Sequence, residues 1–400
     1  MESTVTGTTV SGDAASGTFG RLVRLIERRY ESFFPPGQGI TFALQQAGKA
    51  PHVFGPGEPE VTLVVHDKSA VAALGSMDRT TICEAYMDGS FDIEGDITRI
   101  LSMRNFFPDR HPLRFAWRFA QPFIFGQVSS DKKWIAQHYD YDQDFYLLWL
   151  DREHRCYSQG IFAHDDEPLE DAITRKLDTA IEATGLKPGD RVLDIGGGWG
   201  AFLEYAGNKG IHVTSLTISR ESEKFLNGII ARDGLPCQAL REHFFEHQPA
   251  ERYDAIVNLG VTEHLPDYRA SLAKYQALLK PGGKIYLDAS AARVKYSVSD
   301  FLEKYIYPGN GSLLCLHDYL TELSKTPFEL LSVANDRHNY YLTIKHWAQR
   351  LDDAREEVER RWGKTLYRKF QLYLWGCADG FSRDMIQAYR WVLHLPESAG

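Results

Sequence analysis

From about residue 170 onward, short apolar runs alternate with amphipathic segments in a regular order. The apolar runs are 191–196, 211–219, 237–240, 253–260 and 284–290, and their length and flanking turns predict β-strands. Between them, apolar residues recur at helical spacing in 172–186, 201–210, 220–234 and 268–283. Strands that alternate with helices usually form a parallel sheet covered on both faces. We therefore predict an α/β fold for this part of the chain.

The residues before this alternation follow a different pattern. A helical periodicity over 18–34 precedes short strand patterns at 60–67 and 90–96 and short helix patterns at 70–76 and 97–107. This mixture predicts a smaller N-terminal α+β domain over 21–104, which we interpret as a lipid or accessory domain. The small polar residues of 1–20 predict a disordered tail and contain no apolar core of a secretory signal. The larger domain is expected to cover 136–400 and to include an amphipathic helical segment at 347–381.

A connector of unusual composition, 105–135, joins the two predicted domains. It mixes proline, aromatic and basic residues in the stretch NFFPDRHPLRFAWRFAQPFIFGQ. One interpretation is an aromatic linker packed on the following domain. The other is a surface that meets lipid, with Arg and Lys at the headgroups and Trp and Phe below them. The sequence alone leaves both open.

Composition narrows the class of protein. The chain has 400 residues, 43% of them hydrophobic and 25% charged, which is typical of a globular protein. Its net charge of −9 argues against wholesale binding to nucleic acid. The chain contains no run of 18 apolar residues, so the sequence predicts no membrane-spanning helix. The five cysteines are scattered without a CxxC pair, which favours a reducing compartment and argues against a structural metal site.

The most informative short stretch is VLDIGGGWGAF, residues 192–202. Here a predicted strand ends in Asp194 and runs into a turn with Gly196, Gly198 and Gly200, after which a helix begins. Glycine lets a backbone approach a ligand closely, and open α/β sheets bind ligands at the carboxyl ends of their strands. The turn therefore predicts a nucleotide-like cofactor, although the GxGxxG spacing of dinucleotide sites fits poorly. The alternative is a turn that only allows tight packing of helix on strand.

Longer strings carry a resemblance to a known family. LKPGDRVLDIGGGWG and LLKPGGKIYL resemble the first and a later motif of class I S-adenosylmethionine (SAM) methyltransferases. Six further strings occur in the same order as in cyclopropane-fatty-acyl-phospholipid synthases, and mycolic acid cyclopropane synthases share the catalytic part. These strings are QHYDYDQDFYLLWLD, CYSQGIF, LTISRES, GVTEHL, YIYPG and GCADGFSRDMIQAYRWVL, and through them the chain resembles both groups of enzymes. EAYMDGSFDIEGDI resembles the N-terminal domain of the phospholipid-acting form. The resemblance covers roughly 80–400 and implies a class I methyltransferase, Rossmann-like sheet with helices on both faces.

This resemblance implies that the cofactor is SAM, and it implies where SAM binds. The methionine end is expected near the glycine turn and the ribose and adenine near the end of the second strand. The implied cofactor-binding residues are Tyr157, Ser158, Asp194, Gly196, Gly198, Trp199, Gly200, Thr217, Ser219, Ser222 and Glu242. At Ser222 the family usually has Gln, so this residue departs from the pattern.

The resemblance also implies carbocation chemistry. Methyl transfer to an isolated alkene leaves a cation on the acyl chain, which aromatic faces can shield and stabilise. The candidates for this role are Phe145, Tyr146, Trp199, Tyr340 and Tyr341, although most aromatic residues belong to a core. In the family the base is a bound bicarbonate, and Glu263 and Tyr340 fall on two of the positions that hold it. His264 could serve structure or catalysis.

Two departures from the family pattern affect the base: the family's cysteine in YSC is Gln159 here, and its histidine in HTI is Asp288. The cysteine of the family's glycine turn is also replaced, by Gly197. Bicarbonate is therefore in question, and one hypothesis is that Asp288 itself replaces it, oriented by Gln159 and Tyr340, with Glu263 nearby. The alternative for Asp288 is a salt-bridged residue at a strand end.

The sequence thus predicts a SAM-dependent C-methyltransferase that acts on an unsaturated fatty acyl chain. We expect a cytoplasmic protein that is peripheral to the inner face of the membrane. The sequence leaves open whether the protein forms a homodimer and whether its substrate is a metabolite alkene. It also leaves open whether the product is branched or carries a methylene group in place of a ring. A non-catalytic SAM- or lipid-binding module is the alternative of a different class.

Overall fold

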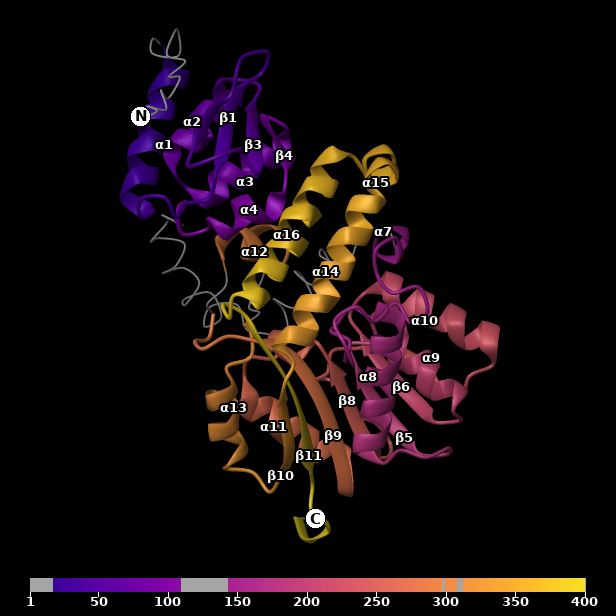
Figure 1. The fold of residues 1–400 in the computed structure, drawn as a ribbon. Coiled ribbons are helices and arrows are strands. Elements are labelled where there is room, and N and C mark those ends of the chain that lie inside the picture. The colour runs from indigo at the N-terminus through magenta and orange to yellow at the C-terminus, as the bar shows by residue number, and fades with distance from the viewer. Residues whose placement is uncertain (1–16, 109–142, 297–298, 308–311, 400) are drawn as a thin grey trace. The chain divides into compact units, whose positions relative to one another are not determined.

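The computed structural model describes residues 17–108, 143–296, 299–307 and 312–399 (Figure 1). The chain divides into two compact units. The first contains Met1–Arg110 together with Lys364–Arg368, and the second contains His111–Gly363 and Lys369–Gly400. Most of the predicted connector, 105–135, lies outside the described residues.

The first unit is an α+β domain built on a four-stranded sheet of order β2-β1-β3-β4. Strand β1 pairs in parallel with β3, whereas the β1–β2 and β3–β4 pairs are antiparallel. Aspartate side chains cap α2, α3 and α4, which explains why these short helices begin where they do. The elements are α1 Thr18–Phe33, β1 Phe42–Gln46, β2 His52–Phe54, β3 Val61–Val65, α2 Lys68–Ser76, α3 Arg79–Asp88, β4 Phe91–Gly95 and α4 Ile97–Ser102.

Two predictions at the edges of this unit need correction. Helix α1 begins at Thr18, so the end of the predicted tail, 18–20, is helical. Phe106 and Phe107, which open the predicted connector, are buried, and Phe106 packs against Phe33, Phe34 and Phe42. These two aromatic side chains therefore belong to the core of the first unit.

The second unit is a seven-stranded sheet of order β10-β11-β9-β8-β5-β6-β7. The strands from β9 to β7 are parallel to one another, whereas β11 is antiparallel to both of its neighbours. The prediction of a parallel sheet is therefore confirmed for the five strands that it named, β5 to β9, and the antiparallel edge of β10 and β11 was not predicted. The strands are β5 Arg191–Ile195, β6 His212–Thr217, β7 Gln238–Arg241, β8 Tyr253–Leu259, β9 Leu279–Ala291, β10 Glu329–Asn335 and β11 Gln387–His394.

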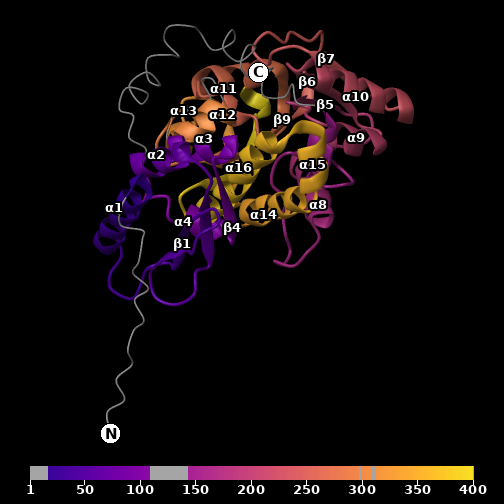
Figure 2. The ribbon, with the colours of Figure 1, turned by 90° about the horizontal axis from the view of Figure 1, so that it is seen from above.

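Helices cover both faces of this sheet, as predicted. Figures 1 and 2 show α9 and α10 beside β5 and β6, and α11 and α13 toward the β9 side. Side chains of α11 and α13 share one buried cluster with Leu193, Ile256 and Leu287 of the central strands, while α8 packs on β8 and β9 with other residues. The helices are α7 Gln143–Leu147, α8 Leu169–Thr184, α9 Ala201–Asn208, α10 Arg220–Asp233, α11 Tyr268–Leu278, α12 Asp300–Tyr305, α13 Leu316–Leu323, α14 Arg337–Asp353, α15 Arg355–Trp362 and α16 Lys364–Ser382, with two short 3-10 turns, Thr262–His264 and Glu397–Ala399.

The described helices are all too short or too polar to cross a membrane.

Candidate functional site

The glycine turn lies between β5 and α9 and forms one wall of a pocket. The turn is anchored because the backbone N–H groups of Gly196 and Gly197 both donate to the Leu216 carbonyl, at 2.9 Å each. Gly198 has a φ of +50°, and a Cβ there would meet only the Gly196 carbonyl oxygen, at 3.7 Å, so its open side faces the pocket. At Gly200 a Cβ would lie 2.9 Å from the Ile229 side chain, so this glycine serves helix packing.

The pocket holds an empty volume of about 1130 Å³, which includes space open to solvent. Cofactor sites in proteins commonly have volumes of this order. Ten of the eleven predicted cofactor-binding residues line it, and the exception is Gly200: the lining contains Tyr157, Ser158, Asp194, Gly196, Gly198, Trp199, Thr217, Ser219, Ser222 and Glu242.

Two carboxylates stand at this pocket. Asp194 is buried and accepts a hydrogen bond from the Ser215 hydroxyl, and burial raises its pKa to about 6. Glu242 accepts from the ring of the buried His247 at 2.7 Å, and the other ring nitrogen of His247 lies 2.9 Å from the Tyr253 hydroxyl. The pocket therefore presents two acidic groups whose positions are fixed by partners behind them.

Three hydroxyl side chains follow the second strand. Ser219 caps α10, and its oxygen accepts from the Ser222 N–H at 3.3 Å. The Ser222 hydroxyl donates to the Gly198 carbonyl at 2.6 Å, while the Thr217 hydroxyl accepts from the Ser219 N–H at 3.2 Å. Ser222, the residue that departs from the family pattern, thus holds the glycine turn in place.

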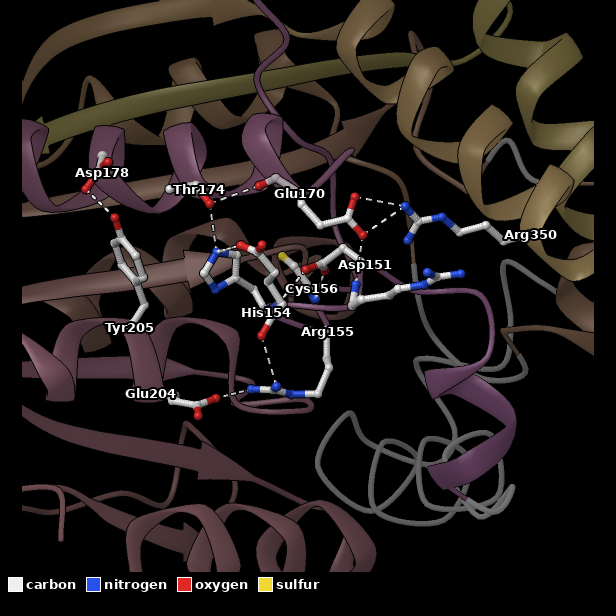
Figure 3. Close-up of polar contacts among 12 residues, drawn as sticks. Asp151, His154, Arg155, Cys156, Glu170, Thr174, Asp178, Glu204, Tyr205 and Arg350 are labelled. Carbon is white, nitrogen blue, oxygen red and sulfur yellow. Dashed lines mark hydrogen bonds and ion pairs between the residues drawn. The ribbon is translucent and has the colours of Figure 1, made fainter. Parts of the chain in front are cut away.

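The buried Asp151 fixes the backbone of residues 154–156, two of which, Arg155 and Cys156, line the pocket (Figure 3). The Asp151 carboxylate accepts from the backbone N–H groups of His154 and Cys156, at 2.6 Å each. Arg155, which lines the pocket, pairs with Glu204 of α9 and donates to the Trp199 carbonyl at 3.2 Å.

Further contacts tie this segment to two helices. The Glu170 carboxylate of α8 accepts from the Arg152 N–H at 3.0 Å and from Arg350 of α14 at 2.8 Å. His154 contacts the Thr174 hydroxyl of α8 at 2.8 Å. The segment that carries Tyr157 and Ser158 is therefore held against α8, α9 and α14.

An aromatic cluster continues from the pocket wall. The centroid of the Tyr157 ring lies 5.4 Å from the ring centroids of both Trp149 and Trp347. The ring centroids of Trp199 and Tyr146 lie 5.6 Å apart. Of the five aromatic candidates, only Trp199 lines the pocket. Phe145 and Tyr146 are core residues without exposed surface, and Tyr341, half-buried on α14, lies 6.0 Å from the His338 ring.

Asp288 forms a buried ion pair. Its carboxylate lies 2.9 Å from the Lys176 ammonium, and the two side chains are 0% and 1% exposed. The Lys176 ammonium also donates to the Ser158 hydroxyl. Burial opposes the charge on Lys176, but Asp288 outweighs it and raises the lysine pKa, while burial raises the pKa of Asp288. The salt-bridged alternative for Asp288 is what the structure shows, and its role as a base stays a prediction.

Glu263 lies in the 3-10 turn that follows β8, between Val261 and His264, which both line the pocket. Ser290, two residues beyond Asp288 on β9, donates to Glu263 through its backbone and its hydroxyl, at 2.7 Å each. Burial raises the pKa of Glu263 to about 7. The structure thus places a carboxyl group of near-neutral pKa beside the pocket.

The other two predicted catalytic residues are also buried. Gln159 follows Ser158, and its side-chain oxygen has no hydrogen-bond partner among the described residues. Tyr340 stacks on Phe381 at 4.6 Å, and burial together with the charges of Glu263 and Asp288 raises its pKa. None of the four predicted catalytic residues lines the pocket that the described residues form.

Comparison with known proteins places the chain in a family. Residues 127–391 match the model of the family described as mycolic acid cyclopropane synthetase. The chain belongs to the mycolic acid cyclopropane synthetase family. Residues 29–105, in the first unit, match a separate domain of unknown function.

Relatives in this family carry different reactions in their names. The chain is 29% identical to the cyclopropane-fatty-acyl-phospholipid synthase of Escherichia coli, over 77% of this chain and 81% of that protein. It is 27% identical to a sphingolipid C9-methyltransferase of Candida albicans, over 80% of this chain and 69% of that protein. For a sphingolipid C9-methyltransferase of Gibberella zeae, the chain spans only 63% of the relative's length.

Solved structures agree with this placement. The cyclopropane synthase MmaA2 from Mycobacterium tuberculosis superposes with a TM-score of 0.60 at 26% identity, over 65% of this chain and 96% of that one. Mycolic acid cyclopropane synthase CmaA1, complexed with SAH and CTAB, gives a TM-score of 0.61 at 25% identity, over 65% of this chain and 96% of that one. The chain is a SAM-dependent methyltransferase, and its cofactor is SAM.

The pocket fits this cofactor. Gly198 leaves open the space that a side chain would fill, and Asp194 and Glu242 supply negative charge for a cationic ligand. Sequence reasoning missed Arg155, Lys176 and Ser290. Lys176 could have been found, because it lies on the buried face of α8 with Ile173 and Leu177, where a lysine needs a charged partner.

Proposed function

We propose that this chain transfers the methyl group of SAM to the double bond of an unsaturated fatty acyl chain, carried by a phospholipid. A carbocation on the acyl chain then loses a proton within the site. The observation that carries the proposal is the continuity between the SAM pocket and a buried aromatic cluster. Tyr157 and Trp199 belong to both. Family membership and the similarity to the E. coli phospholipid enzyme support the same substrate class.

The residues that would hold SAM are those that line the pocket. Gly196, Gly198 and the Tyr157–Ser158 pair are proposed for its methionine end. Thr217, Ser219 and Glu242 are proposed for its ribose and adenine, because hydroxyls and a carboxylate can bond sugar hydroxyls and ring amines. When bound, SAM supplies an electrophilic methyl group on a sulfonium.

The protein's own contribution is to exclude water and to stabilise positive charge. Trp149, Trp347 and Tyr146 are buried behind the pocket wall, so water that would capture a cation is kept away from this side. The faces of aromatic rings attract cations without reacting with them. A buried carboxyl group beside the pocket, Glu263, adds negative charge when it is ionised.

The second candidate differs in the product. If the proton leaves from the transferred methyl group, a cyclopropane ring closes; if it leaves from a neighbouring chain carbon, the product is a methyl-branched alkene. A methylene product needs a hydride shift that moves the cation to the methylated carbon, after which the methyl group loses the proton. The 27% identity to a sphingolipid C9-methyltransferase supports the branched product. Gln159 and Asp288, which differ from the residues of the ring-forming pattern, point the same way. A metabolite alkene in place of an acyl lipid is the remaining candidate.

The proposed setting is the surface of a membrane in a reducing compartment, the inner face of the cytoplasmic membrane. Support comes from the phospholipid named in the E. coli relative and from the basic and aromatic composition of 105–135. The five cysteines, which all lie among the described residues, form no disulfide with one another, which fits this setting.

The test is lipid mass spectrometry of a bacterial host that makes monounsaturated phospholipids but no cyclopropane lipids. Expression of the chain should add the mass of one CH2 to monounsaturated acyl chains, and Gly198→Val should abolish the gain. Growth on trideuteromethyl methionine separates the products: a ring keeps two deuterium atoms and a branch keeps three. Unchanged acyl chains with a folded, SAM-binding protein would favour a metabolite alkene.

A further inference from the structure

The carboxyl group of Glu263 is held asymmetrically. Its Oε1 atom accepts both hydrogen bonds from Ser290, one from the backbone N–H and one from the hydroxyl, at 2.7 Å each. Its Oε2 atom is buried and has no hydrogen-bond partner among the described residues. Two donors on one oxygen fix the plane of the group, and the other oxygen keeps its lone pairs for a ligand.

The backbone of Glu263 is fixed as well. Its carbonyl accepts from the Ser312 N–H at 2.7 Å, and the 3-10 turn follows directly on the end of β8. Its neighbours Val261 and His264 line the SAM pocket. The Oε2 atom therefore belongs to a rigidly held side chain whose next residue along the chain, His264, lines the SAM pocket.

Charged and titratable groups surround Glu263 on three elements. Asp288 on β9 raises the pKa of Glu263, and Glu263 in turn raises the pKa values of Tyr268 on α11 and Tyr340 on α14. Burial is the largest cause and brings the pKa of Glu263 to about 7, while the Ser290 donors act against it. A carboxylate of this pKa is a far stronger base than one in water, and it is about half ionised at pH 7 and largely ionised at mildly alkaline pH.

Asp288 is in a different position. Its carboxylate is neutralised by Lys176 at 2.9 Å, so taking up a proton would break a buried ion pair. The surroundings also disfavour an anionic base. Three buried acceptor oxygens, Gln159 Oε1, Glu263 Oε2 and Asp288 Oδ1, have no hydrogen-bond partner among the described residues, and Glu263 itself takes the Ser290 N–H donor. An anion such as bicarbonate needs donors, and an ionised Glu263 repels it, while the Lys176 ammonium is already paired with Asp288.

Resting on the proposed function, we infer that Glu263 is the base that removes the proton from the carbocation, without a bicarbonate ion. In this step Oε2 bonds the proton, and the C–H bond breaks. The electron pair of the broken C–H bond forms the new C–C bond of a ring or the C=C bond of an unsaturated product. The glutamate becomes a neutral carboxylic acid, which returns its proton to water before the next turnover. Ser290 is a positioning residue that acts through Glu263.

The first test uses purified protein, SAM and monounsaturated phospholipid vesicles in buffer freed of carbon dioxide. Turnover should be the same with and without added bicarbonate, and it should fall as the pH drops below about 7, as protonation of Glu263 requires. Glu263→Gln should lose at least about 100-fold in turnover at unchanged SAM affinity, with no rescue by bicarbonate. Turnover that needs bicarbonate, or an active Gln variant, would overturn the assignment.

The second test moves the pKa of the base without removing it. Ser290→Ala deletes one of the two donors to Oε1, so the acid limb of turnover should shift upward by about 0.5 to 1 pH unit. Ser312→Ala is the matched control, because its hydroxyl bonds to the backbone of 296 and 313 and not to the Glu263 carboxyl group. The substitution keeps the backbone N–H that Ser312 donates to the Glu263 carbonyl. An acid limb at the same pH in both variants would contradict the inference. A wild-type protein that methylates no alkene would instead overturn the proposed function.

Discussion

The buried ion pair between Lys176 and Asp288 allows the most quantitative prediction about the fold. Asp288→Asn removes one charge and leaves the Lys176 ammonium in a site where its side chain is 1% exposed. Breaking a buried pair by removing one partner typically destabilises a protein by about 3–5 kcal/mol, because an uncompensated charge stays buried. We therefore expect Asp288→Asn and Lys176→Met each to lower the free energy of unfolding by about that amount.

The double variant should behave differently from the sum of the two. With Lys176→Met and Asp288→Asn together, neither charge of the pair is left without its partner, so the loss should be smaller than the two single losses added, by about 1–3 kcal/mol. The pair Lys325–Glu322 is a surface control, with the lysine side chain 60% exposed at a distance of 2.6 Å. Lys325→Met should cost less than about 1 kcal/mol.

Urea unfolding followed by tryptophan fluorescence measures these changes. The six tryptophans among the described residues all belong to the second unit, so their signal reports on the unit that contains the ion pair. Single variants that lose no more than the Lys325→Met control would refute the reasoning. Strict additivity in the double variant would refute it as well.

Three further predictions follow from the pocket, the buried acid and the connector. Gly198→Val should weaken SAM binding at least about 10-fold, or about 1.4 kcal/mol, because the branched side chain enters the pocket and φ is positive; unchanged affinity by calorimetry in a folded variant would contradict this. The pKa of Glu263 is raised from 4.5 to about 7, so the folded protein holds a proton that the unfolded chain releases between these values. The free energy of unfolding should therefore decrease, by on the order of 3 kcal/mol, as the pH rises through this window, and Glu263→Gln should remove that decrease in urea titrations. Binding to anionic vesicles should weaken with added salt, since screening acts on exposed charges; no sedimentation with vesicles at any ionic strength would favour a soluble substrate.

The central sheet and the cofactor pocket could be predicted because their signals are local. The apolar run before Gly196 and the helix stops at Gly210 and Gly234 stand in the sequence itself, and both stop glycines have the positive φ that favours glycine. Asp194, Gly196 and Gly198 are expected from the glycine turn itself, whereas Tyr157, Ser158, Thr217, Ser219 and Glu242 are expected from the resemblance to the synthase family; all of them line the pocket. Gly200 was assigned to the cofactor because its spacing matches the turn, but its role is packing against Ile229.

The sheet edge and the proton-transfer region could not be predicted in this way, because long-range contacts define them. Strand β11 carries Arg390, which interrupts its apolar pattern and pairs with the buried Asp336 of a distant segment. The partners of Asp288 and Glu263 are likewise far along the chain or on another element. Lys176 is more than one hundred residues before Asp288, and Ser290 meets Glu263 only when β9 lies beside β8.

The most direct measurement of the central claim follows the methyl group itself. Purified protein is incubated with trideuteromethyl SAM and with phospholipid vesicles whose acyl chains are either monounsaturated or saturated. The account predicts deuterium in the acyl chains of the unsaturated lipid alone, with one S-adenosylhomocysteine formed for each label transferred. Label in the headgroup, label in the saturated lipid, or S-adenosylhomocysteine without labelled lipid would contradict it.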